Sequence, residues 1–184
     1  MRLWCAQAEG QTVKRRLTFK NSTAVGVSVT TLTLETLLGA QAKDEALRRQ
    51  SSSGGVFTLL AREVIRRGGV VFGAAFGENM RVEHVGAFDE TELSGMRGSK
   101  YVQSDATDAI GNAVSLLKRE IPVLFSGTPC QVDGLYRYLG EHPERLVTCD
   151  VACSGVCSPG VWARLVSSMA YVKQHRPVAV EFCG

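Results

Sequence analysis

The feature that most constrains the fold is the succession of a strand, a tight loop, a helix and a second strand between residues 121 and 151. Residues 121–125 and 146–151 are short apolar runs, and the helical pattern that begins at Gln131 ends at Gly140. Two strands joined through a helix pair in parallel, with a right-handed crossover. The sequence therefore predicts an α/β fold with a βαβ unit around residues 121–151.

The same alternation of amphipathic helices and apolar strands extends toward the N-terminus. Gly68-Gly69 ends one helical pattern, and Asp105 is placed to cap another. These patterns predict a β-sheet with flanking helices. The further elements expected are helices over residues 44–49, 55–67, 106–119 and 161–172, and strands over residues 25–34, 70–76 and 81–88.

Composition narrows the classes of protein. The 184 residues are 45% hydrophobic, which is enough apolar surface for a folded domain. The 21 basic and 18 acidic residues give a net charge of +3 without a large basic block, so we expect no nucleic-acid surface. No apolar run reaches membrane-spanning length, and the threonines and Glu35 within residues 23–38 argue against a signal peptide. We expect a cytoplasmic protein.

Cys130 follows the strand at residues 121–125 directly, after Gly127, Thr128 and Pro129. Ligands gather at the carboxyl ends of parallel strands, and a helix N-terminus favours a thiolate or a bound anion. A thiolate can bind a metal cluster or act as a nucleophile. The alternative interpretation is a small buried hydrophobic residue, which is how we interpret Cys5 and Cys183.

Cys149, Cys153 and Cys157 repeat at intervals of four residues at the end of the next predicted strand. This spacing favours a 4Fe-4S site over zinc, because a zinc ribbon requires closely spaced cysteine pairs. Sulfurs four residues apart on an extended strand are separated by about 13 Å. We therefore expect Cys130 and Cys153 to converge while Cys149 stays in the interior of the sheet.

Two loops are suited to an anionic or aromatic ligand. Ser52, Ser53, Gly54 and Gly55 open a helix, where hydroxyls and free N–H groups can hold phosphate; a serine-rich cap with a glycine turn is the alternative. Ser99, Lys100 and Tyr101 combine a hydroxyl, a cation and an aromatic ring, which suits a flavin, although the same residues suit a solvated loop.

The three histidines, at positions 84, 142 and 175, are scattered and predict no catalytic triad. Cys130 as the nucleophile of a thiol enzyme therefore lacks an identifiable base.

Several segments together resemble the beta-subunit family of coenzyme F420 hydrogenases and dehydrogenases, and most closely its bacterial iron–sulfur oxidoreductases. The resemblance covers about residues 42–162. It is carried by SSSGG at 51–55, GVVFGA at 69–74, GSKYVQS at 98–104, GTPCQ at 127–131 and CSGVCSP at 153–159.

The resemblance implies an oxidoreductase subunit with FAD and a 4Fe-4S cluster. Electrons would pass between cluster and flavin, and hydride between flavin and an acceptor such as coenzyme F420. Its partners would be other redox subunits or ferredoxin-like donors. The implied cluster ligands are Cys130 and Cys153, with Cys149 and Cys157 as further candidates. The implied flavin-site residues are Ser52, Ser53, Gly54, Gly55, Ser99, Lys100, Tyr101, Gly127 and Thr128.

The chain also departs from the family. Ser154 stands where members usually have histidine, and Cys157 stands where they have proline. Members continue past Trp162 with further cysteines, so we interpret the chain as truncated. The expected organisation is an unassigned segment over residues 1–41, the α/β domain over 42–172 and a truncated tail over 173–184. The rival hypothesis is a non-catalytic α/β remnant or partner-binding module whose cysteines only pack.

Overall fold

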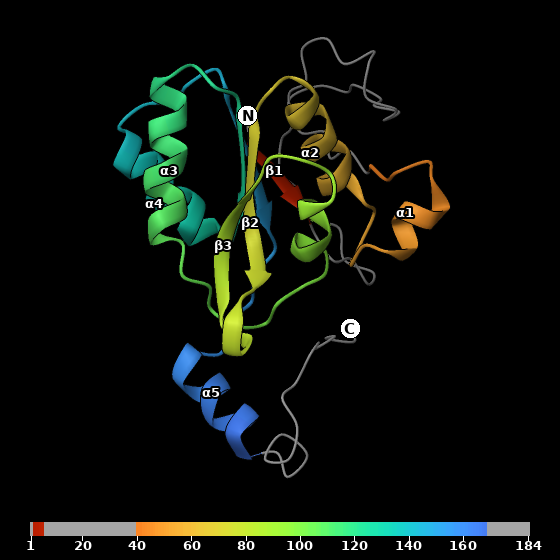
Figure 1. Ribbon diagram of the computed structural model, residues 1–184, viewed down its shortest axis with the longest axis vertical. Helices are drawn as coiled ribbons and strands as arrows, with labels where there is room; N and C mark the ends of the chain where they lie inside the picture. Colours follow the sequence, from red (N-terminus) through yellow and green to blue (C-terminus); the bar gives the residue numbers. More distant parts are fainter. Residues whose placement is uncertain (1, 6–39, 169–184) are drawn as a thin grey trace.

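The computed structural model describes residues 2–5 and 40–168 (Figure 1). The strand expected at residues 25–34, the tail over 173–184 and Cys183 lie outside the described residues.

Five strands form one mixed sheet in the order β1-β5-β4-β2-β3. Neighbouring strands among β1, β5, β4 and β2 are parallel, and β3 pairs antiparallel with β2 at the edge. The strand bounds are Arg2–Cys5 (β1), Val70–Phe76 (β2), Val82–Ala87 (β3), Val123–Gly127 (β4) and Leu146–Val151 (β5). The predicted α/β class with a sheet and flanking helices is confirmed.

The predicted βαβ unit is also present. Strands β4 and β5 are parallel, with Phe125 opposite Thr148, and helix α4 (Pro129–Leu139) connects them. This helix begins two residues earlier than expected, because Thr128 forms a capping box with Gln131 and Pro129 occupies the first turn. It ends at Gly140, whose φ of 70° is in the left-handed region that glycine adopts readily.

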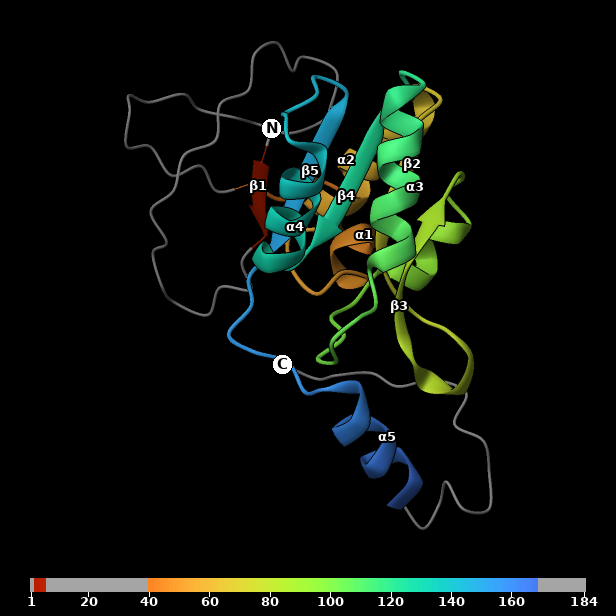
Figure 2. The same ribbon diagram turned by 90° about the vertical axis from the view of Figure 1, so that its left-hand side faces the viewer.

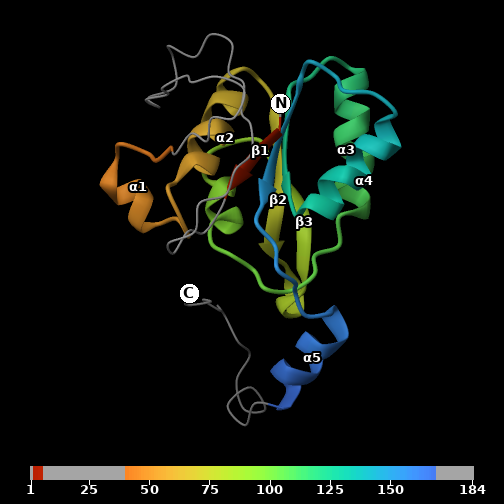
Figure 3. The ribbon, with the colours of Figure 1, turned by 180° about the vertical axis from the view of Figure 1, so that it is seen from behind.

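Helices cover both faces of the sheet. Figures 2 and 3 show α3 (Thr107–Lys118) and α4 on one face, and α2 (Val56–Arg66) with the short α1 (Glu45–Arg49) on the other. The 3-10 helix η2 (Glu92–Met96) packs on the face covered by α2, and η1 (Glu78–Met80) joins β2 to β3.

Each face has its own hydrophobic core. Successive residues of a strand point to opposite faces, so Phe125 packs with α3 and α4 while its neighbour Leu124 packs with α2. Both side chains are fully buried, and the tight packing of such cores leaves few voids. The two cores therefore hold the sheet in a three-layer arrangement.

A third, smaller cluster anchors helix α5 (Pro159–Ser168) beside the sheet. Trp162 Nε1 donates to the Met80 carbonyl at 2.8 Å, and its ring centroid lies 6.3 Å from that of Phe76. Val161 and Leu165 on the same helix stay exposed. The helix begins two residues before the predicted start at residue 161.

This topology places three helix N-termini at one edge of the sheet. We call it the carboxyl edge, because β2, β4 and β5 all end there (Figures 1 and 2). Helices α2 and α3 return the chain to the opposite edge before β2 and β4, and α4 leaves directly from the end of β4. The positive ends of the three helix dipoles therefore point toward the edge at which open α/β sheets bind ligands.

Candidate functional site

The loop over residues 50–55 leads into α2 at the carboxyl edge. Ser52 and Ser53 are exposed, and no described residue hydrogen-bonds to their hydroxyl groups. Gly55 is the N-cap of α2, with φ of 74°, and α2 has no side-chain cap at this position. The serine hydroxyls therefore do not cap α2, whereas the glycine turn of that alternative is present at Gly55.

Gly54 has a packing role that the sequence did not reveal. A Cβ at this position would lie 2.9 Å from the Ala40 carbonyl oxygen, and the Ala42 N–H donates to the Gly54 carbonyl at 2.6 Å. Gly54 thus allows the backbone at residues 40–42 to lie directly against the loop. The packing explains this glycine without a ligand.

Lys100 lies in the predicted loop, half-buried beside the end of η2. Its Nζ donates to the carbonyls of Gly95 and Arg97, both at 2.8 Å. Burial lowers the pKa of its ammonium group to about 8, because the charged form loses hydration. Lys100 therefore ties the loop after η2 to the carbonyl end of that short helix.

The second predicted loop also pairs with the cysteine-rich turn. Cys157 N–H donates to the Tyr101 carbonyl at 3.2 Å, and Gln103 N–H donates to the Cys157 carbonyl at 3.0 Å. The Cys157 thiol donates to the same Tyr101 carbonyl at 3.3 Å. The Tyr101 side chain is 39% exposed, so its ring is accessible at this junction. A predicted flavin residue and a predicted cluster residue are thus brought together.

A buried histidine joins β3 to the end of β4. His84 is only 7% exposed, and its Nε2 lies 2.9 Å from the Ser126 carbonyl oxygen, so Nε2 carries the hydrogen and donates. Its Nδ1 then accepts from the Ser104 hydroxyl at 2.9 Å. The ring stacks on Phe125 with centroids 5.2 Å apart. Burial lowers the pKa of His84, although its hydrogen bond to Ser126 and the nearby Asp105 carboxylate oppose this effect.

Gln131 extends this network to Cys130. Its Nε2 donates to the Ser104 hydroxyl oxygen at 2.9 Å, and its Oε1 accepts from the Thr128 N–H at 3.0 Å and the Thr128 hydroxyl at 3.1 Å. The Thr128 hydroxyl hydrogen is therefore used, and its oxygen can accept from the Cys130 thiol, whose sulfur lies 3.1 Å away.

Gly127 makes room for this arrangement. A Cβ there would lie 3.1 Å from the Gln131 Oε1 atom and 3.3 Å from the Gln131 Cβ. The absence of a side chain at the end of β4 lets the Gln131 amide fold back over the strand. Gly127 and Thr128, predicted as flavin-site residues, have these structural roles at the carboxyl edge.

The structure separates the four predicted cluster ligands by burial. Cys130 and Cys153 are exposed and Cys157 is half-buried, whereas Cys149 is 1% exposed and packs in the core under α2. The prediction that Cys149 stays in the interior of the sheet is confirmed. Within residues 40–168, no three His, Cys, Asp or Glu side chains lie close enough together to hold a metal ion. The four-cysteine ligand set is therefore not assembled by the described residues, and the convergence of Cys130 and Cys153 stays a prediction.

Sequence reasoning missed several residues at this edge. Gln131 stands three residues after Thr128, a spacing that indicates a capping box, and His84 alternates with exposed neighbours in β3, which indicates an inward side chain. Arg97 had no such pattern. Its Nε atom is buried and has no hydrogen-bond partner among the described residues.

Comparison with known proteins supports the resemblance. Residues 37–110 match the family described as coenzyme F420 hydrogenase/dehydrogenase, beta subunit N-term. The match spans both loops up to Tyr101 and confirms the family resemblance in that stretch. A search of curated proteins found no match.

A solved structure shares the fold. A chain of the xenon-derivatised F420-reducing NiFe hydrogenase complex from Methanosarcina barkeri matches with a TM-score of 0.55 and 19% sequence identity. The match covers 71% of this chain and 48% of that chain, so this chain spans about half the length of its structural relative. Among the described residues, no helix has both the length and the apolar character needed to cross a membrane.

Proposed function

We propose, on the premise that residues 37–110 carry the N-terminal domain of the coenzyme F420 hydrogenase/dehydrogenase beta-subunit family, that this chain is the flavin-binding part of an oxidoreductase subunit. The observation that carries the proposal is that the two flavin-predicted loops lie at one edge of the sheet. The residue 50–55 loop leads into α2, and the loop through Tyr101 pairs with the Cys157 turn.

The groups available at the carboxyl edge fit a flavin nucleotide. Such a ligand has a flat aromatic ring system and one or more phosphate groups. The exposed Tyr101 ring is suited to the ring system, and the hydroxyls of Ser52 and Ser53 beside the N-terminus of α2 are suited to phosphate. The buried Nε of Arg97 has no acceptor among the described residues, so a negatively charged ligand group near this guanidinium would be favourable.

When bound, a flavin supplies hydride and single-electron transfer. The protein's part is to bind and orient it. Lys100 ties its loop to η2 through two carbonyls, and Gln131 joins the start of α4 to Ser104. These contacts hold the loops around the proposed site in one conformation, which lowers the entropy lost on binding.

The cluster part of the proposal is narrower. We propose Cys130, Cys153 and Cys157 as cluster donors, and we leave out Cys149 because it lies in the core. The described residues do not assemble a ligand set, so no electron-transfer step is assigned to them. A hydride acceptor such as coenzyme F420, redox partner subunits and a cytoplasmic setting complete the proposal.

The test is to purify the full chain without oxygen and to measure flavin, iron and sulfide per chain. We expect one flavin per chain and less iron than a complete cluster requires. A folded protein that binds no flavin at saturating FAD would refute the proposed function. Four iron atoms per chain would instead refute the incomplete ligand set.

A further inference from the structure

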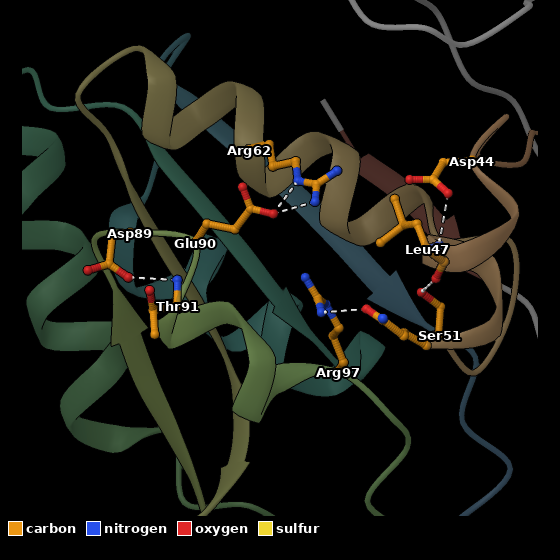
Figure 4. A network of polar contacts seen from close by, with 9 residues as sticks. Asp44, Leu47, Ser51, Arg62, Asp89, Glu90, Thr91 and Arg97 are labelled. Carbon is orange, nitrogen blue, oxygen red and sulfur yellow. Dashed lines mark hydrogen bonds and ion pairs between the residues drawn. The ribbon is translucent and has the colours of Figure 1, made fainter.

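Arg97 has no carboxylate partner among the described residues, whereas five other arginines in that part of the chain pair with glutamates. Among the described residues, its only side-chain hydrogen bond is from Nη1 to the Gln50 amide oxygen at 3.1 Å (Figure 4). Arg62, on the facing helix α2, pairs with Glu90. Arg49, Arg66, Arg67 and Arg145 also pair with glutamates.

The Arg97 guanidinium is also incompletely hydrogen-bonded. Its Nε atom is buried from solvent and has no acceptor among the described residues. A buried donor that has lost water without gaining an acceptor is unfavourable, and more so when the group is charged. A negative group bound at the guanidinium would offset this free-energy cost, because the positive charge is delocalised over all three guanidinium nitrogens.

The surroundings of Arg97 favour an anion. Gln50, its hydrogen-bond partner, is the first residue of the residue 50–55 loop, which contains Ser52 and Ser53 and ends at the positive N-terminus of the 11-residue helix α2. The Lys100 ammonium is a second cation nearby in the chain and donates to the Arg97 carbonyl at 2.8 Å. Within the described part of the chain, no acidic side chain pairs with either cation.

We infer that Arg97 binds the phosphate-bearing part of the flavin nucleotide, at the entrance of the residue 50–55 loop. The inference rests on the proposed function and adds to it a residue that discriminates phosphorylated flavins from riboflavin. Guanidinium donors match phosphate oxygens in pairs, which gives both affinity and orientation. The phosphate can be the single one of FMN or one of the two in FAD.

The test compares R97Q with the matched control R62Q, which removes an equal charge from an exposed arginine nearby. Riboflavin, FMN and FAD are titrated into each protein, and binding is followed by flavin fluorescence. We expect R97Q to weaken the binding of FAD by about tenfold or more, because it removes a charge-assisted contact, while riboflavin affinity stays within about twofold. R62Q should leave all three affinities unchanged. An equal loss for FMN and FAD assigns the phosphate nearest the ribityl chain, and a loss for FAD alone assigns the adenylate side.

Two results would overturn the inference. Either R97Q binds FAD as tightly as wild type, or R97Q weakens riboflavin and FAD by the same factor, which would make Arg97 a purely structural residue. If R97Q fails to fold by circular dichroism, R97M replaces it, because methionine retains an apolar stem and removes the charge.

The inference is also testable if the flavin proposal fails. If the wild-type chain binds no flavin, inorganic pyrophosphate serves as the probe in a thermal-shift measurement. Pyrophosphate should then raise the melting temperature of wild type and R62Q but not of R97Q. Equal shifts in wild type and R97Q, or no shift in wild type, would overturn the anion role of Arg97.

Discussion

At the scale of the residue, the Gln131 amide joins three segments of the carboxyl edge. It bonds to Ser104 in one loop and to Thr128 at the end of β4, and it starts α4. We expect Gln131→Leu to lower the free energy of unfolding by about 1 kcal/mol or more, because half-buried polar groups of Thr128 and Ser104 lose their hydrogen-bond partner. Gln103→Leu, the same change at an exposed position, is the control and should cost less than about 0.5 kcal/mol. Urea unfolding of both variants measures the difference, and equal effects would contradict the network's role.

His84 predicts a dependence of stability on pH. Burial lowers its pKa in the folded state, so the unfolded chain binds more protons between the folded pKa and the ordinary value of about 6.5. Stability should therefore fall as the pH falls through this window. We expect the urea midpoint of wild type to drop more between about pH 7.5 and about pH 5.5 than that of His84→Gln, which does not titrate. Parallel pH profiles for the two proteins would contradict this expectation.

The cysteines predict opposite effects on stability and on iron. Cys149→Ala removes a buried sulfur and should cost about 1 kcal/mol or more of unfolding free energy. Cys130→Ala changes an exposed side chain and should cost less than about 0.5 kcal/mol, yet it should reduce bound iron if Cys130 is a donor. Chemical denaturation and an iron assay on both variants test this pair. Unchanged iron in Cys130→Ala would remove Cys130 from the proposed donors.

The sequence predicts the position of a side chain when its own strand or helix determines that position, and not when partners distant in the sequence do. The interior placement of Cys149 could be predicted, because it requires only the strand direction and the spacing to Cys153. The role of His84 could not be predicted, because its partners Ser104 and Ser126 come from a loop and a strand that lie 20 and 42 residues away. Asp105 accepts from the Thr107 N–H at 3.0 Å, but Ala106 is the N-cap of α3. The local pattern thus identified Asp105 as a helix-capping residue but assigned it to the wrong position relative to the helix start.

At the scale of the element, two kinds of glycine make contrasting predictions. A Cβ at Gly69, between α2 and β2, would lie 2.5 Å from the Pro122 carbonyl oxygen and 2.6 Å from the Val64 side chain. A Cβ at Gly134, within α4, would meet no atom within 4 Å. We expect Gly69→Ala to destabilise the protein by about 2 kcal/mol or more, because backbone must move.

Gly134→Ala should instead stabilise the protein by about 0.5–1 kcal/mol, because alanine loses less entropy than glycine in a helix. Melting temperatures of the two variants give the signs directly. A stabilised Gly69→Ala would contradict the close approach of α2 to the start of β4.

Element boundaries followed the periodicity of the sequence closely wherever a helix packs on the sheet. Helices α2, α3 and α4 and strands β2 to β5 lie where their apolar patterns predict them. The predicted start of α4 was two residues too late, because a proline such as Pro129 is common both in loops and in the first turn of a helix. The order of the strands, with β2 rather than β3 beside β4, depends on long-range packing that no local pattern encodes.

At the scale of the whole molecule, the topology of the sheet places both loops of the proposed flavin site at the carboxyl edge. The parallel strands end at one edge, and three helices begin there, so the positive ends of three helix dipoles point toward that edge. A groove lies away from this edge, between the C-terminal parts of α3 and α4, and is lined by residues such as Leu117 and Tyr138. We therefore assign the proposed flavin site to the carboxyl edge and not to this groove.

The most direct test of the central claim is amide hydrogen exchange of the full chain with and without FAD. We predict that FAD slows exchange in residues 50–57 and 97–104, which form the two loops of the carboxyl edge. The backbone amides that line the groove around Leu117 and Tyr138 should exchange at the same rate with and without FAD. Protection at that groove, or binding of FAD without protection of either loop, would contradict a flavin site at the carboxyl edge.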